Sequence, residues 1–172
     1  QAVASPLEQA KKRVEQRLEN SSVRHPILRP SYFTEIWLSQ TYWPEFGFDF
    51  VRRHARIAGD GRNQVNWISL ADVARYAVDS IGNVASHDKS LDLGGPDALS
   101  PLEVVDLLGR ASGKAFHVDF VDEGKLRAKH SQSAGAFDEA FAALLFSCSE
   151  GSVIDCTEAR WTLPFELCSV RT

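Results

Sequence analysis

The stretch "SPLEQAKKRVEQRLENSSVRHPILRPSYF", residues 5–33, predicts a helix, then a short buried strand, then an aromatic turn. Its first four residues place a hydroxyl at the N-cap, a proline at the first helical position and a carboxylate three residues after the cap, which is the pattern of a capping box. The apolar segment "PILR" (26–29) reads as a strand that ends at Pro30. A helix that leads directly into a buried strand indicates an α/β fold.

The predicted first helix carries a lysine within its apolar stripe. With ~100° per residue, the stripe is formed by Leu7, Ala10, Val14 and Leu18. Lys11 falls inside this stripe and Lys12 outside it, with Glu15 one turn further on as a candidate partner for Lys11. Two interpretations follow: the stem of Lys11 covers apolar surface while its ammonium reaches water, or the ammonium points into a polar cleft and binds a ligand hydroxyl or phosphate.

The rest of the chain interleaves helices with strands. Further helices are predicted over residues 69–82, 100–113 and 135–148, and further strands over residues 54–59, 64–69, 90–93 and 115–121. The segment "GDGRN" (59–63) is expected to join two strands as a hairpin turn. The fold class predicted from this order is α/β with a mixed sheet.

Composition excludes several classes of partner. The 172 residues are 44% hydrophobic, which is sufficient for one domain with a core, and the net charge is −4 with scattered basic residues. We therefore expect no nucleic-acid partner. No apolar run approaches the ~20 residues that span a bilayer, and no signal peptide is visible, so we expect no membrane partner and a cytoplasmic location.

The sequence offers no recognisable metal motif. The three cysteines, Cys148, Cys156 and Cys168, lack the paired spacing of a zinc site. The five histidines, namely His25, His54, His87, His117 and His130, form no i,i+4 pair. In the strand 115–121, Phe116, Val118 and Phe120 are expected on the packed face, with His117 and Asp119 on the solvated face. Asp72 is the third residue of a capped helix, which gives it a structural role.

Five segments carry a resemblance to a known family: "K-x-x-x-E-x-x-L" (11–18), "ILRPSYFTEIW", "RIAGDG", "WISLADVARYAV" and "LDLGGPDALSPLEVVDLLGRASGK". In order and spacing they resemble the C-terminal half of NmrA-like proteins, atypical members of the extended short-chain dehydrogenase/reductase superfamily. The resemblance covers residues 5 to about 130. It implies the C-terminal portion of a Rossmann-like NAD(P)-binding fold, in which residues 1–50 supply the last Rossmann helix and strand with the aromatic turn. Residues 51–172 then form a small mixed α/β lobe for a substrate or partner.

The cofactor implied by the resemblance is NAD(P), which the family binds through a glycine-rich turn after its first strand. This sequence has no G-x-G-x-x-G motif, contains no Met and begins with Gln1. We therefore expect a fragment that lacks the first strands of the Rossmann half and binds NAD(P) weakly or not at all by itself. The sheet edge beside "PILR" is expected to be open, so a second copy of the chain could dimerise through it.

The resemblance also implies the roles of particular residues. Lys11 matches the lysine that binds the nicotinamide ribose and assists catalysis. The segment beside the nicotinamide matches Pro30, Ser31, Tyr32 and Phe33, and the proton donor would be Tyr32 or a nearby water. A substrate cleft would be lined by Trp37, Trp43 and Phe46, for which core packing is the alternative.

One departure from the family pattern separates the functional hypotheses. Leu7 stands four residues before Lys11, where active dehydrogenases carry a tyrosine. The first hypothesis is an NAD(P)-dependent oxidoreductase that transfers a hydride to or from a small organic carbonyl or enone substrate. The second is a non-catalytic dinucleotide sensor or structural pseudo-enzyme that binds a regulatory protein, which the missing tyrosine favours. The third is an independent α/β interaction module, favoured by the absent phosphate loop.

Overall fold

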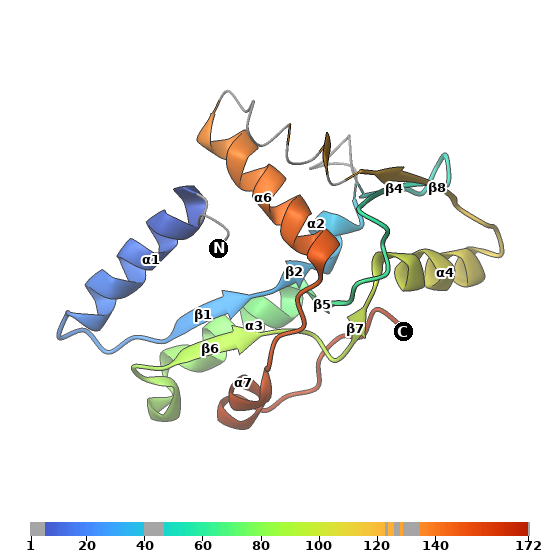
Figure 1. Cartoon of the computed structure of the whole chain (residues 1–172). Coiled ribbons are helices and arrows are strands. Elements are labelled where there is room, and N and C mark those ends of the chain that lie inside the picture. The colour runs from blue at the N-terminus through green and yellow to red at the C-terminus, as the bar shows by residue number, and fades with distance from the viewer. Residues whose placement is uncertain (1–5, 40–46, 123, 126–127, 129–134, 172) are drawn as a thin grey trace.

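The computed structural model describes residues 6–39, 47–122, 124–125, 128 and 135–171, and the fold is α/β (Figure 1). The helices are α1 (Pro6–Glu19), α2 (Thr34–Trp37), α3 (Leu70–Ile81), α4 (Pro101–Ser112), α6 (Ala136–Glu150) and α7 (Thr157–Thr162), with a 3₁₀ turn η1 (Val84–Ser86). The strands are β1 (Ile27–Pro30), β2 (Tyr32–Phe33), β3 (Gly47–Asp49), β4 (His54–Ala58), β5 (Val65–Ile68), β6 (Ser90–Leu93), β7 (Ala98–Leu99) and β8 (His117–Val121).

The described strands form three small sheets, each containing a parallel pair. Their orders are β1-β6, β2-β5-β7 and β3-β4-β8, with β1·β6, β2·β5 and β4·β8 parallel. Ser31 links the first two sheets: its backbone N–H donates to the Leu93 carbonyl at 2.8 Å, and its hydroxyl donates to the Asn66 carbonyl at 2.8 Å. Both β1 and β2 pair with strands beyond residue 50, so the two portions expected from the sequence pack together.

The predicted hairpin over residues 59–63 is wrong. Both edges of β4 are already occupied, by β3 and β8, so β5 pairs instead with β2 and β7 in a different sheet. The segment turns the chain from one sheet to the other. Its buried Gly61, at φ +70°, packs beside Ile57 and Leu102, and its carbonyl accepts from the Leu102 N–H at 3.1 Å.

Two helices begin at the capping residues that the sequence predicts. The Ser69 hydroxyl accepts from the Asp72 N–H at 2.9 Å at the start of α3. At α4, the Glu103 N–H donates to the Ser100 hydroxyl and the Ser100 N–H donates to the Glu103 carboxylate, at 3.2 and 2.7 Å, which is a complete capping box. Gly113 ends α4 in the left-handed region at φ 66°. The cap predicted for α1, Ser5, lies outside the described residues.

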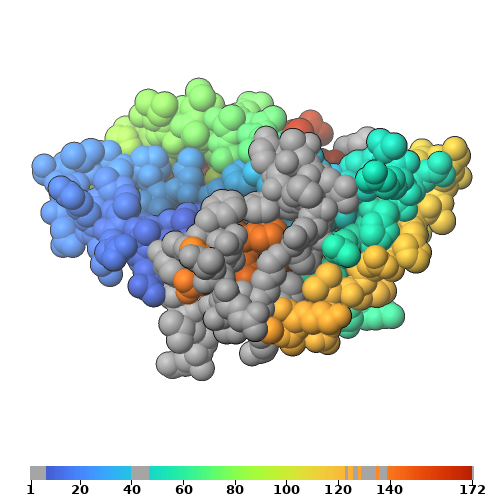
Figure 2. Space-filling view, turned by 90° about the horizontal axis from the view of Figure 1, so that it is seen from above, coloured from blue at the N-terminus to red at the C-terminus, as the bar shows by residue number. Residues whose placement is uncertain are grey.

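Two apolar clusters support the sheets. One joins β2, β4, β5 and α4 around buried residues that include Tyr32, Trp67 and Val104. The other packs α3 and α7 against β6 through residues that include Tyr76 and Leu91. Figure 2 shows α1 and the β4·β8 pair at opposite ends of the molecule. None of the helices in the described parts of the chain has both the length and the apolar character needed to cross a membrane.

Candidate functional site

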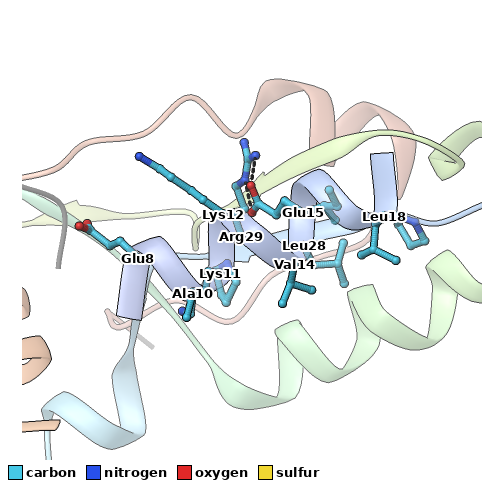
Figure 3. Close-up of a pocket in the computed structure, with 12 residues that line it drawn as sticks. Glu8, Ala10, Lys11, Lys12, Val14, Glu15, Leu18, Leu28 and Arg29 are labelled. Atoms are coloured by element: carbon cyan, nitrogen blue, oxygen red, sulfur yellow. Dashed lines mark hydrogen bonds and ion pairs between the residues drawn. The ribbon is translucent and has the colours of Figure 1, made fainter. Parts of the chain in front are cut away.

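An open cavity of about 810 Å³ lies between the helix α1 and the strand β1 (Figure 3). This volume lies within the range of ~300–1,000 Å³ that is usual for small-molecule sites. Its apolar lining is Ala10, Val14, Leu18, Pro26, Ile27, Leu28 and Pro30, and its charged lining is Glu8, Lys11, Lys12, Glu15 and Arg29. Most of the surface is therefore apolar, with charged groups contributed mainly by the helix.

An ion pair connects the two sides of the cavity. The Arg29 guanidinium donates from Nε and Nη2 to the two oxygens of Glu15, at 3.0 and 2.8 Å. This bidentate hydrogen bond is the first cause that lowers the pKa of Glu15, and Lys12 and Lys11 lower it further by their charge. Glu15 is thus bound to β1, across the cavity from its own helix.

Lys11 lines the cavity without a hydrogen-bond or ion-pair partner among the described residues. Its charge acts on Glu15, but the carboxylate of Glu15 is bound by Arg29. Figure 3 shows Lys11 on the side of α1 that carries Ala10 and Val14, whereas Lys12 extends to the other side of the helix. As the helical wheel predicted, Lys11 lies beside the apolar stripe and Lys12 does not.

The apolar stripe of α1 faces the cavity and is only partly covered. Val14 is 60% exposed and Leu7 is 40% exposed, so neither residue is packed into a core. The cause is visible in the sheet: among the described strands, β1 has β6 as its one neighbour, and the edge near α1 has no strand partner. The cavity occupies the space beside that edge.

The residues predicted to lie beside the nicotinamide separate into two environments. Pro30 lines the cavity together with Lys11, at the carboxyl end of β1. Ser31 instead forms the two hydrogen bonds that join the sheets. Phe33 packs partly buried against the cluster of α3 and β6.

Tyr32 lies in the core, 8% exposed, and its ring meets Trp37 edge-on with 5.1 Å between ring centroids. Burial raises the pKa of its phenol to about 12, and a hydrogen bond with the Ser147 side chain acts in the opposite direction. The phenol therefore stays protonated at neutral pH, and its burial favours packing over proton donation. Trp37 is partly buried between two apolar clusters. The other two residues predicted for the substrate cleft, Trp43 and Phe46, lie outside the described residues.

Two polar residues that connect separate elements, Asn66 and Glu35, were not predicted from the sequence. The Asn66 side-chain oxygen accepts from the Ile154 N–H at 2.9 Å, and Asn66 is 6% exposed. The signal for it was present, because a lone amide in the apolar run "VNWI" needs a buried partner. Glu35 accepts from the Leu70 N–H at the start of α3, at 3.0 and 3.2 Å, and no local pattern indicates so distant a contact.

The structural role predicted for Asp72 is confirmed and extended. Besides its place in the cap of α3, its carboxylate accepts from the Cys168 N–H at 3.0 Å, and it is 4% exposed. Asp72 thus attaches the C-terminal segment to α3, which is a sufficient reason for a buried acid at this position.

No known family profile matches the sequence. Two known proteins are similar to part of it. The agroclavine dehydrogenase of Claviceps fusiformis is 34% identical over 121 residues, which are 69% of this chain and 40% of that protein. The uncharacterized oxidoreductase YesF of Bacillus subtilis (strain 168) is 26% identical over 125 residues, which are 72% of this chain and 41% of that protein. The chain thus spans less than half the length of these relatives.

Solved structures share the fold at low sequence identity. Isoflavone reductase matches 99% of this chain with a TM-score of 0.74 at 18% identity, and the match covers 59% of that structure. Leucoanthocyanidin reductase from Vitis vinifera matches 99% of this chain and 61% of its own, with a TM-score of 0.76 at 18% identity. The NADPH complex of quinone oxidoreductase QOR2 from Escherichia coli matches 97% of this chain and 58% of its own, with a TM-score of 0.72 at 18% identity.

The two sequence relatives are named as a dehydrogenase and an oxidoreductase, and the three structural neighbours are reductases or oxidoreductases. The chain therefore has an α/β fold that corresponds to part of the Rossmann-like fold of these solved structures.

Proposed function

We propose that this chain forms part of an NAD(P)-dependent oxidoreductase of the NmrA-like group. The reaction is hydride transfer between the nicotinamide cofactor and a small organic carbonyl or enone. One observation carries the proposal: Lys11, without a partner among the described residues, lines the cavity next to the carboxyl end of β1. In open α/β sheets, ligands bind beyond the carboxyl ends of the strands. The names of the sequence relatives agree with this reaction class.

The residues present fit one end of the dinucleotide. Lys11 supplies a cation with three N–H donors for ribose hydroxyls, and Pro30 offers an apolar surface beside it. The segment from Ser31 to Phe33 would flank the nicotinamide. The pyrophosphate needs a glycine-rich turn at a helix N-terminus, and the sequence printed here lacks that motif. We therefore expect weak or no binding of NAD(P) by this chain alone.

Proton transfer in this proposal does not use a tyrosine paired with the lysine. Leu7 occupies the tyrosine's place, and Tyr32 is buried with a raised pKa. When bound, NAD(P) would exchange a hydride with the substrate; a water at the open cavity would give the proton when the substrate is reduced and take it when the substrate is oxidised. Tyr32 then supports the aromatic turn by packing against Trp37.

The absent tyrosine also favours a second candidate function. A protein that binds NAD(P) without turnover would report the cofactor to a regulatory protein, and it would need Lys11 but no proton donor. The two functions share the binding site and differ in whether bound NADPH is oxidised.

The binding site is tested in a chimaera in which this chain replaces the matching segment of the Claviceps fusiformis relative. NADPH affinity is measured by the quenching of tryptophan fluorescence. We expect Lys11→Ala to weaken the affinity at least tenfold, through loss of a charge-assisted hydrogen bond. The matched control is Lys12→Ala: Lys12 also lines the cavity but extends to the other side of α1, so we expect a smaller loss than for Lys11→Ala. Equal effects of the two substitutions would exclude Lys11 as a cofactor-binding residue.

A further inference from the structure

The sheet β3-β4-β8 brings two histidines into one row. The parallel register of β4 and β8 places His54 opposite His117 and Arg56 opposite Asp119. Since side chains alternate along a strand, His117 and Asp119 share a face, and His54 shares that face across the strand pair. The opposite face carries Ala55 and Ile57, which are buried.

The two imidazoles converge on the same carboxylate. His54 Nε2 lies 2.9 Å from one oxygen of Asp119, and His117 Nε2 lies 3.3 Å from the other. The rings are stacked, with 5.5 Å between centroids and 14° between planes. One ligand atom from each of the three residues lies within 4.8 Å of the others.

We propose that His54, His117 and Asp119 form a binding site for a divalent transition-metal ion of the zinc type. Imidazole nitrogen and carboxylate oxygen are established zinc ligands, with bonds of ~2.0–2.2 Å. Tetrahedral bonds of that length separate neighbouring ligand atoms by ~3.3 Å. A metal ion lies in the plane of each imidazole that binds it, so the two stacked rings must rotate toward each other to reach this arrangement. Three protein ligands leave the fourth position to water.

The charged groups around this point are two carboxylates and two arginines. Asp119 presents one oxygen to His54 Nε2 at 2.9 Å and the other to His117 Nε2 at 3.3 Å, so its carboxylate lies between the two imidazoles. Asp49, the β3 residue opposite His54, accepts from the Arg52 N–H at 2.8 Å and from its guanidinium at 3.2 Å. The two carboxylates, Asp49 and Asp119, are thus matched by two arginines, Arg52 and Arg56, and an ion here would be held by its bonds to the three ligands.

The site is distinct from the cavity of Lys11. β4 and β8 lie at the end of the molecule opposite to α1 (Figure 2). The ligands come from two strands that are distant in sequence and adjacent in the sheet. A bound ion would thus link β4 to β8 and stabilise this sheet.

The test uses the untagged chain, titrated with Zn²⁺ in competition with a chromophoric chelator, and with Co²⁺ followed by its visible absorption. We expect one ion per chain, loss of about 100-fold in affinity for His117→Gln and for Asp119→Asn, and a rise in melting temperature with Zn²⁺ only when the site is intact. The side chain of His117 is 76% exposed, so His117→Gln keeps the fold, which circular dichroism checks.

The matched control is His87→Gln, which changes a histidine away from this cluster and is expected to bind Zn²⁺ within twofold of the unaltered chain. Binding of less than one equivalent by the unaltered chain would overturn the proposal. Equal affinities of the His87→Gln and His117→Gln variants would overturn it as well.

Discussion

Two adjacent lysines show how one residue step changes the environment of a side chain. Lys11 lies with the apolar stripe of α1, and Lys12 extends to the other side of the helix (Figure 3). Each residue turns the helix by ~100°, which carries Lys12 outside the stripe that includes Lys11. The wheel could therefore distinguish the two lysines before the structure was known. It could not show that Glu15 pairs with Arg29, because that contact depends on how α1 lies against β1.

The raised pKa of the Tyr32 phenol leads to a prediction about stability at high pH. Its pKa is about 12 in the folded chain against an ordinary value of 10.0. Between these values the folded state keeps the proton that the unfolded state loses, so the stabilising effect is complete below pH 10 and declines as pH rises through 12. As pH rises through this range, we expect the free energy of unfolding of the unaltered chain to fall by about 2–3 kcal/mol more than that of Tyr32→Phe. The size follows because one pKa unit corresponds to ~1.4 kcal/mol.

The measurement is urea unfolding of both proteins at intervals from pH 9 to 12. Tyr32→Phe keeps the ring beside Trp37, and the other groups that titrate in this range are common to the two proteins. Identical declines in the two proteins would show that the phenol of Tyr32 is not protected by burial.

At the scale of elements, the loop after β6 makes a close contact that only glycine allows. A Cβ added to Gly95 would lie 1.9 Å from the carbonyl oxygen of Trp67 in β5. The loop must approach this closely because β7, which follows it, pairs with β5. The pair "GG" at 94–95 therefore has a packing role between two sheets.

We expect Gly95→Ala to lower the free energy of unfolding by ~3 kcal/mol or more, because backbone must move to accept the methyl group. Gly82 is the matched control: it ends α3 at φ −103°, and a Cβ there meets no atom within 4 Å. For Gly82→Ala we expect a change within ~1 kcal/mol. Thermal and urea unfolding of the two variants compare them directly, and similar losses would contradict the account of this loop.

Local sequence patterns predicted the helices and strands better than they predicted which strands pair with one another. The caps at Ser69 and Ser100 depend on residues three positions apart, so the sequence was sufficient to place α3 and α4. The hairpin at 59–63 was wrong because the sequence does not show that β3 and β8 occupy both edges of β4. Phe120 was expected on the packed face, yet it is 54% exposed on β8, the outer strand of its described sheet.

The same limit applies to the candidate sites. Lys11 and Pro30 could be predicted because each lies within a helix-strand unit that is continuous in sequence, and both line the cavity. The cluster of His54, His117 and Asp119 could not, because it depends on the register between β4 and β8. A motif search detects ligands at fixed spacing, and these residues have none.

At the scale of the whole molecule, the apolar stripe of α1 and the edge of β1 surround the cavity without a strand between them in the described part of the chain. The chain also spans 40% of the length of one sequence relative and 59% of one solved structure. These facts make the chimaera with a relative the appropriate form in which to test activity, because the rest of the relative supplies the remaining length.

Oxidation of NADPH by that chimaera tests the central claim most directly. The loss of NADPH absorbance is followed with a panel of small carbonyl and enone compounds. We predict oxidation above the rate without substrate, and a fall of at least tenfold in kcat/KM for Lys11→Ala but not for Lys12→Ala. Tight binding of NADPH without oxidation on any compound would contradict the oxidoreductase function and favour the sensor.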